Sequence, residues 1–209
     1  MLFKRRAKVG GEIALYGLEK WWLGSFSSEE REYITSLYQP MNEPRRRILT
    51  EGDLSDQKDS PYLDQNRESL LSALPGWLRK PQDRPLQRKL IEESMPLARS
   101  VSAKHFLLIQ LIESVYRDRD RDPNALMRVI RLCEQDIAIA DAFQKDCRRR
   151  WPSDALPRHP GFEKLAIIRD KQGELQAALK ISRQARKQGW SGDWEKRITR
   201  LHQKADRKS

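Results

Sequence analysis

Apolar residues recur at helical spacing along most of this chain, and no segment shows the alternation of polar and apolar residues that a strand requires. Stripes at i, i+3 and i+4 are typical of amphipathic helices that bury one face. Proline and glycine interrupt the pattern repeatedly, which limits each helix to a few turns. The sequence therefore predicts an all-α fold, in which helical hairpins pack as a short repeat-like bundle with a C-terminal basic helix.

Three segments follow from the pattern and its interruptions. Residues 1–38 are predicted to be an N-terminal helical segment. Residues 39–61 combine prolines, a glycine and a run of three arginines, so we expect a mobile loop or linker there. Residues 62–209 regain the helical spacing and are predicted to form the repeat-like helical domain.

The N-terminal segment contains two predicted helices. The first covers residues 11–23 and ends on a pair of tryptophans. The second begins at a capping box, in which the Ser27 hydroxyl accepts from the backbone N–H of Glu30 and the Glu30 side chain reaches back. Both helices place large apolar residues on one face, so they need a packing partner.

The strongest helical signals lie further along the chain. Residues 105–116 are apolar on nearly every side, which is typical of a central, buried helix. A long helix is predicted over residues 122–149, and Cys133 and Cys147 lie on it. Fourteen residues at ~1.5 Å per residue separate them by roughly 21 Å, whereas a disulfide needs Cα atoms within ~7 Å. We therefore expect two free thiols and a reducing, cytoplasmic location.

The last 48 residues contain a helix, a glycine turn and a second helix, and this spacing resembles a tetratricopeptide-like repeat, a helix–turn–helix unit of ~34 residues. Gly173 stands at the position of the turn. The positions that resemble the helix-packing residues of the repeat are Phe162, Leu165, Ala166, Leu175, Ala178, Leu179 and Ala185.

A single repeat cannot bury its own apolar face. We therefore expect the helices within residues 86–149 to pack against residues 162–188. A closing helix is expected to follow, because Trp194, Ile198, Leu201 and Ala205 are spaced to share one face.

The whole chain also resembles uncharacterised bacterial and phage-borne helical proteins. The resemblance rests on Trp21-Trp22 followed by Phe26-Ser27-x-Glu29-Glu30-Arg31, together with the repeat-like tail. It implies no particular activity.

Motifs that would indicate chemistry are missing from the sequence. There is no paired-histidine or Cys-x-x-Cys spacing, no phosphate-binding glycine loop and no nucleophile elbow. The segment Asp118-Arg-Asp-Arg-Asp122, whose charges alternate, lacks the glycine and the glutamate that a calcium loop needs. We therefore expect no enzyme, no catalytic residue, no metal and no cofactor.

One weak enzymatic pattern remains. Arg99 and His105 are separated by five residues, and this resembles the Arg-x(4–6)-His signature of HEPN-type, metal-independent ribonucleases. The resemblance implies that the histidine handles the 2′-hydroxyl proton and that the arginine steadies the phosphate. Arg197 and His202 match the same loose pattern, and the apolar run after His105 indicates that this histidine faces the core.

Positive charge is the clearest surface feature. The chain has 41 Lys and Arg against 30 Asp and Glu, a net charge of +11, and residues 174–209 contribute +6 of it. A second basic cluster lies at the start of the chain, within residues 4–8. The predicted phosphate-binding stripe of the closing helix, opposite its apolar face, consists of Lys196, Arg200, Lys204 and Arg207.

These features favour a non-enzymatic helical interaction module, a scaffold or adaptor that binds a protein partner through a repeat groove. The alternative is a nucleic-acid-binding protein that uses the C-terminal basic helix, and the second alternative is the HEPN-like ribonuclease. No transmembrane helix is expected, because no run of ~18 apolar residues exists. No membrane partner is expected either, because the basic cluster at residues 4–8 has no amphipathic helix around it.

Overall fold

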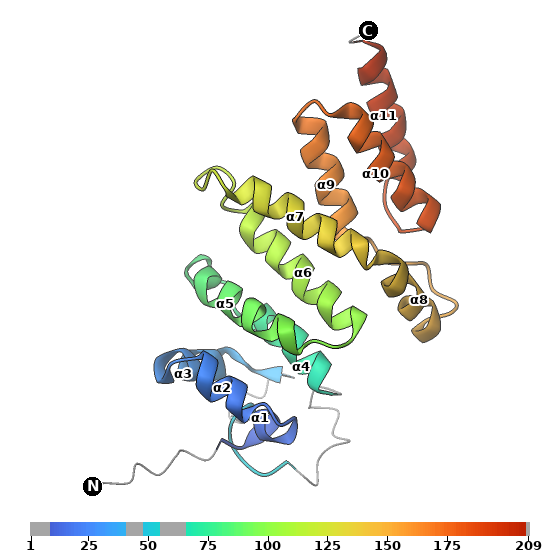
Figure 1. The fold of residues 1–209 in the computed structure, drawn as a ribbon. Helices are drawn as coiled ribbons and strands as arrows, with labels where there is room; N and C mark the ends of the chain where they lie inside the picture. The colour runs from blue at the N-terminus through green and yellow to red at the C-terminus, as the bar shows by residue number, and fades with distance from the viewer. Residues whose placement is uncertain (1–8, 41–47, 55–65, 208–209) are drawn as a thin grey trace, which may run out of the picture. The chain divides into compact units, whose positions relative to one another are not determined.

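The computed structural model describes residues 9–40, 48–54 and 66–207, and the regular elements in these ranges are helices (Figure 1). The predicted all-α class is confirmed. None of the described helices is long and apolar enough to cross a bilayer. The basic cluster at residues 4–8 and much of the expected loop, residues 41–47 and 55–61, lie outside the described residues.

The chain divides into two compact units, Met1–Arg99 and Ser100–Ser209. The described helices of the first unit are α1 (Gly11–Leu15), α2 (Glu19–Ser25), α3 (Ser28–Leu37), α4 (Arg67–Ala73) and α5 (Arg84–Ser94), with 3₁₀ turns at Leu74–Trp77, Pro81–Asp83 and Met95–Leu97.

The prediction of a single helix over residues 11–23 is wrong, because α1 and α2 are separate helices. Gly17 adopts a φ of 65°, a left-handed conformation that ends a helix and that glycine takes without strain. The capping box of α3 is confirmed: the backbone N–H of Glu30 donates to Ser27 Oγ at 3.2 Å, and the backbone N–H of Ser27 donates to Glu30 Oε2 at 2.8 Å. Lys89 also donates to Glu30, which lowers the pKa of that carboxyl.

Part of the expected mobile loop is packed structure. Leu49 and Leu54 are buried, and carbonyls of residues 48–52 accept from the first backbone N–H groups of α1. Gly11 makes this approach possible, because a Cβ there would stand 2.2 Å from the carbonyl oxygen of Ile48. Residues 41–47 and 55–65, on either side of this stretch, lie outside the described residues.

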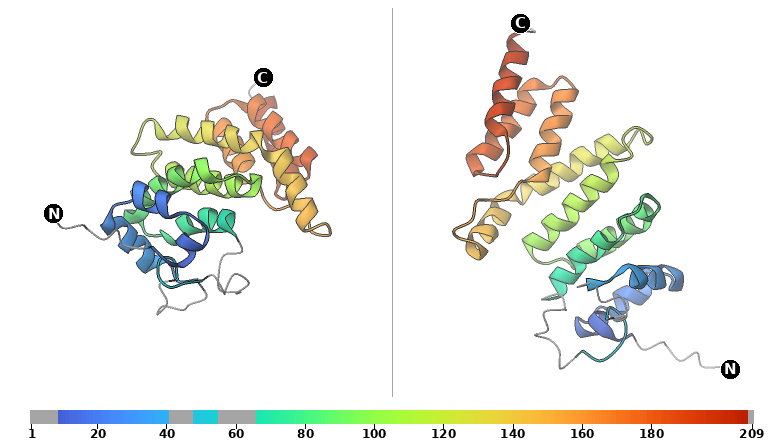
Figure 2. Two further views of the ribbon diagram at one scale, coloured as in Figure 1. Left: turned by 60° about the horizontal axis from the view of Figure 1, so that its bottom comes forward. Right: turned by 180° about the vertical axis from the view of Figure 1, so that it is seen from behind.

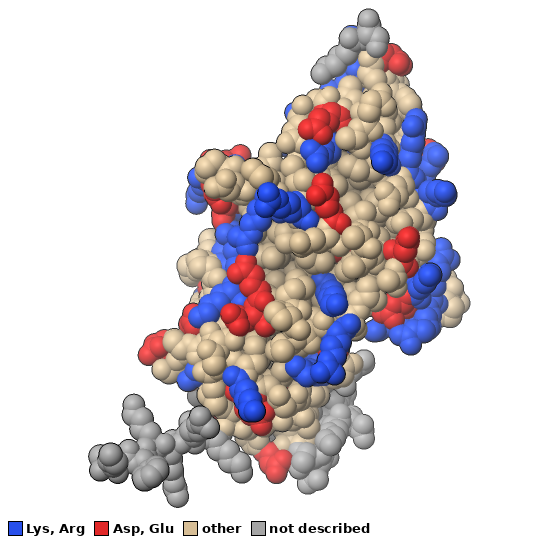
Figure 3. Space-filling view, viewed as in Figure 1, with Lys and Arg blue, Asp and Glu red and all other residues tan. Residues whose placement is uncertain are grey.

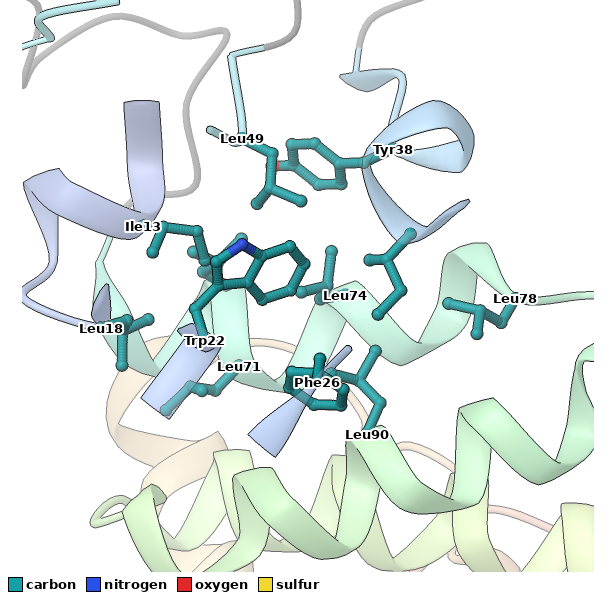
Figure 4. Packing of buried hydrophobic residues seen from close by; sticks show 12 residues of the cluster. Ile13, Leu18, Trp22, Phe26, Tyr38, Leu49, Leu71, Leu74, Leu78 and Leu90 are labelled. Atoms are coloured by element: carbon teal, nitrogen blue, oxygen red, sulfur yellow. The ribbon is translucent and has the colours of Figure 1, made fainter. Parts of the chain in front are cut away.

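The core of the first unit explains why its boundary differs from the one expected at residue 61. Trp22 and Phe26 of the α2 region pack against leucines of α4 and α5, such as Leu71 and Leu90 (Figure 4). Since α4 and α5 complete this core, they belong with α1–α3, and the unit ends at Arg99.

The second unit consists of α6 (Val101–Tyr116), α7 (Ala125–Ala138), α8 (Ala140–Arg150), α9 (Pro160–Lys171), α10 (Leu175–Gln188) and α11 (Trp194–Asp206). Most of its helices pack in chain order: α6 against α7, α7 against α9, α9 against α10, and α10 against α11. The two views of Figure 2 show this succession of antiparallel hairpins. The expected packing of the helices of residues 86–149 against residues 162–188 is confirmed for α6 and α7, which pack against α9, whereas α5 belongs to the first unit.

The prediction of one long helix over residues 122–149 is wrong. The helix breaks at Ile139, whose ψ of 1° is not helical. The break gives α8 its own direction, and Phe143 and Cys147 thereby reach a cluster with Trp190. Both cysteines are buried free thiols, as expected, although they lie on two helices.

The C-terminal hairpin and the closing helix follow the sequence pattern closely. Gly173 turns the chain between α9 and α10 with a φ of 81°. Trp194, Ile198 and Leu201 are buried, and Ala205 is partly buried beside them, so the predicted apolar face of α11 is confirmed.

The left-handed conformation of Gly173 leads to a prediction about stability. Gly173→Val should lower the free energy of unfolding by about 1–2 kcal/mol, because a β-branched residue is strained at positive φ. Gly24→Val is the matched control: Gly24 lies in α2 with open space around it, so the change there should stay below ~0.5 kcal/mol. Denaturation followed by circular dichroism measures the stability of both variants. Equal stabilities of the two variants would contradict the left-handed turn at Gly173.

Candidate functional site

Three polar residues that are distant in sequence meet inside the second unit. His105 comes from α6, Asp136 from α7 and His159 from the residue that precedes α9. All three are buried, with exposures of 2%, 0% and 0%. His105 Nδ1 lies 2.7 Å from Asp136 Oδ1, and His159 Nδ1 lies 3.4 Å from Asp136 Oδ2.

The cluster is incompletely satisfied. Asp136 Oδ2 and both ring nitrogens of His159 have no hydrogen-bond partner among the described residues. The 3.4 Å approach between them is an electrostatic contact that lacks hydrogen-bond geometry. An unpartnered buried polar group costs about 1–3 kcal/mol. Burial also lowers the pKa of His159 to about 4, so this imidazole is uncharged at neutral pH.

Aromatic rings hold the two imidazoles in place. The His105 ring stacks on Phe143 with centroids 3.9 Å apart, and Phe143 stacks in turn on Trp190. The His159 ring meets the rings of Trp190 and Phe162 edge-on at 4.7 and 4.9 Å. Such stacked and edge-on pairs stabilise ring positions beyond the area that they bury.

Two features of the local sequence place Asp136 and His159. Pro160 occupies the first turn of α9, where its missing N–H costs nothing, and His159 therefore stands at the helix start. Gly161 leaves room for the carboxylate, because a Cβ there would lie 2.5 Å from Asp136 Oδ2. The preceding segment is tied to the α10–α11 connection by the Ser191 N–H, which donates to the carbonyl of Pro157.

A cavity of about 330 Å³ borders the cluster. His105 is in its wall, together with Phe143 and Cys147, and most of the lining is apolar. Phe106 and Trp151 also line it and are 43% and 53% exposed, which is unusual for such large apolar side chains. The remaining lining residues are Ile109, Asp154, Ala155, Leu156, Pro157, Arg158 and Pro160.

The sequence did not reveal this site, although it singled out one of its members. His105 faces the core, as expected. Arg99, its partner in the ribonuclease hypothesis, ends the first unit, and its backbone N–H donates to Glu68. Neither Asp136 nor His159 belongs to a recognisable sequence motif. Asp136 lies 31 positions after His105, and His159 lies 23 positions after Asp136.

The predicted phosphate-binding residues of α11 are all exposed. Arg200 and Lys204 both donate to Asp170 of α9, at 2.8 and 2.6 Å. Lys196 lies 3.9 Å from Asp193. The stripe thus exists as a surface feature, but two of its cations share a carboxylate. Figure 3 shows further Lys and Arg side chains, with acidic ones among them, over α8 and α10.

No protein-family model matches this chain, and neither a curated protein nor a solved structure matches it.

The position of Cys147 in the cavity wall leads to a prediction about thiol reactivity. Burial raises the pKa of Cys133 to about 12 and also raises the pKa of Cys147, so both should react slowly in the native protein. Cys147 lines the cavity and should be alkylated by iodoacetamide before Cys133. Peptide mass spectrometry over a time course measures the two rates, with urea-unfolded protein as the reference. Faster modification of Cys133 than of Cys147 would contradict the access of the reagent to Cys147 through the cavity.

Proposed function

We propose that this chain is a non-enzymatic helical interaction module whose second unit binds a protein partner at the cavity beside Phe106 and Trp151. The observation that supports the proposal most is the exposure of these two aromatic side chains at an apolar recess. Aromatic anchors of this kind dominate the energetics of many interfaces. Leaving both in water is unfavourable, and a partner side chain in the recess would remove that cost.

The charge of the unit indicates the chemistry of the partner. Residues 100–209 contain 24 Lys and Arg against 15 Asp and Glu, a net charge of +9. The last turn of α8 is Arg148-Arg149-Arg150, directly before Trp151, and in the described part of the chain Arg149 and Arg150 share the single carboxylate of Asp146. We therefore expect a partner segment with an apolar side chain flanked by Asp or Glu, since complementary charge favours the encounter.

Peptides displayed on phage and selected against the full chain test this proposal. We expect selected sequences to contain a large apolar residue with acidic neighbours. Labelled synthetic versions, titrated by fluorescence anisotropy, should bind the Trp151→Ala variant about 10- to 100-fold more weakly, the loss of a typical hot-spot residue.

Met127→Ala is the matched control. Met127 is as exposed as Trp151, at 53%, but it lies on α7 and does not line the cavity. The proposal requires unchanged binding in this variant. Equal losses in both variants, or no loss in Trp151→Ala, would contradict it.

We propose nucleic-acid binding by α11 as the second candidate. The net charge of +9 and the exposure of Lys196, Arg200, Lys204 and Arg207 support it. Asp170 competes with phosphate for Arg200 and Lys204, so these two cations must leave a carboxylate before they bind nucleic acid.

The competition gives a sharp test with short RNA and DNA. Changing the four basic residues to Gln should flatten the log-affinity against log-salt slope by about 0.7–0.9 for each phosphate that the variant no longer neutralises. Asp170→Asn should act in the opposite direction and tighten binding at low salt. Asp120→Asn, an exposed carboxylate in the α6–α7 turn, controls for net charge and should have a smaller effect. No wild-type binding at about 50 mM salt would eliminate this candidate.

A further inference from the structure

The cluster of His105, Asp136 and His159 offers the donor atoms of a metal site. Two imidazoles and one carboxylate provide the nitrogen and oxygen ligands that Zn²⁺ commonly takes. One ligand atom from each residue lies within 4.8 Å of the others. Ligand atoms around a tetrahedral zinc ion are about 3.4 Å apart, and the two histidine–carboxylate distances are 2.7 and 3.4 Å. Small side-chain movements would therefore be enough to surround an ion.

An independent observation points to a ligand at this place. Asp136 Oδ2 and both nitrogens of His159 lack hydrogen-bond partners among the described residues, although both side chains have no solvent exposure. Gly161, without a Cβ, provides the space in which Oδ2 lies. Aromatic rings enclose the rest of the cluster, and polar atoms arranged in this way are suited to a cation.

We propose that His105, Asp136 and His159 bind one divalent transition-metal ion, for which Zn²⁺ is the best fit. If His105 ligates through Nδ1, the proton of its neutral ring must lie on Nε2, because a ligating imidazole nitrogen carries no proton. His105 also lines the cavity, so a water molecule from that side can complete the coordination. The ion would join α6, α7 and the start of α9. This inference is independent of the proposed interaction function.

Untagged, chelator-treated full-length protein tests the site with Co²⁺ and Zn²⁺ as probes. We expect one equivalent of Co²⁺ to give the visible absorption of a four- or five-coordinate ion, and Zn²⁺ to displace it. Zn²⁺ should raise the melting temperature of the wild type by about 5 °C or more, since it binds only the folded chain. Asp136→Asn, which keeps the side-chain shape, should weaken Zn²⁺ binding at least ~100-fold and abolish the rise.

His202→Gln is the control, because His202 is an exposed histidine on α11 that lies away from the cluster and contacts Arg183. It should leave the affinity and the single equivalent unchanged. Absence of saturable binding in the wild type would overturn the proposal. So would binding that is lost in His202→Gln but kept in Asp136→Asn, since that result would place the ion at the surface.

A second measurement covers the case in which Asp136→Asn does not fold. Imidazole ¹⁵N resonances of the wild type, recorded with and without one equivalent of Zn²⁺, identify the ligating histidines directly. Shifts of His105 and His159 with His202 unchanged support the site. Unchanged His105 and His159 resonances would overturn it.

Discussion

The carboxylate of Asp136 is buried where three elements of the second unit meet, α6, α7 and the start of α9. An ion without solvent costs several kcal/mol unless charged or polar partners surround it. Its hydrogen-bond partner is His105 of α6, and the uncharged ring of His159 at the start of α9 lies 3.4 Å from its other oxygen. The carboxylate can sit there only because residue 161 is a glycine. The cluster thus joins α6, α7 and the start of α9, while buried apolar residues of α9 such as Leu165 and Ile168 contribute to the packing of the same unit.

The sequence predicted those features whose cause is local. The apolar face of α11 and the glycine turn before α10 depend on residues a few positions apart, so their spacing was sufficient. The breaks at Gly17 and Ile139 were not predicted, because the apolar stripe continues through both and only the backbone conformation or the packing of the following helix reveals them. The buried cluster could not be predicted either, since its members meet only through the packing of α6, α7 and α9.

One segment links the cluster to the cavity. Residues 151–160 form much of the cavity wall, and their last part includes His159. Phe143 connects the two from the opposite side, because its ring stacks on His105 and also lines the cavity. The apolar lining therefore borders the cluster on one side and includes the exposed side chains of Phe106 and Trp151 on the other. A change in the position of this segment would alter both sites together.

The basic residues of α11 are partly structural. Arg200 and Lys204 reach across to Asp170 of α9, whereas the buried side chains of Trp194, Ile198 and Leu201 hold the opposite face of the helix. Partly exposed ion pairs contribute little, typically ~0–1 kcal/mol each, while a buried large apolar side chain contributes about 1.5–3 kcal/mol. The apolar face therefore anchors the helix, and the two ion pairs add comparatively little to its stability. Arg200 and Lys204 are therefore engaged within the unit, and the proposed nucleic-acid binding would require both to leave Asp170.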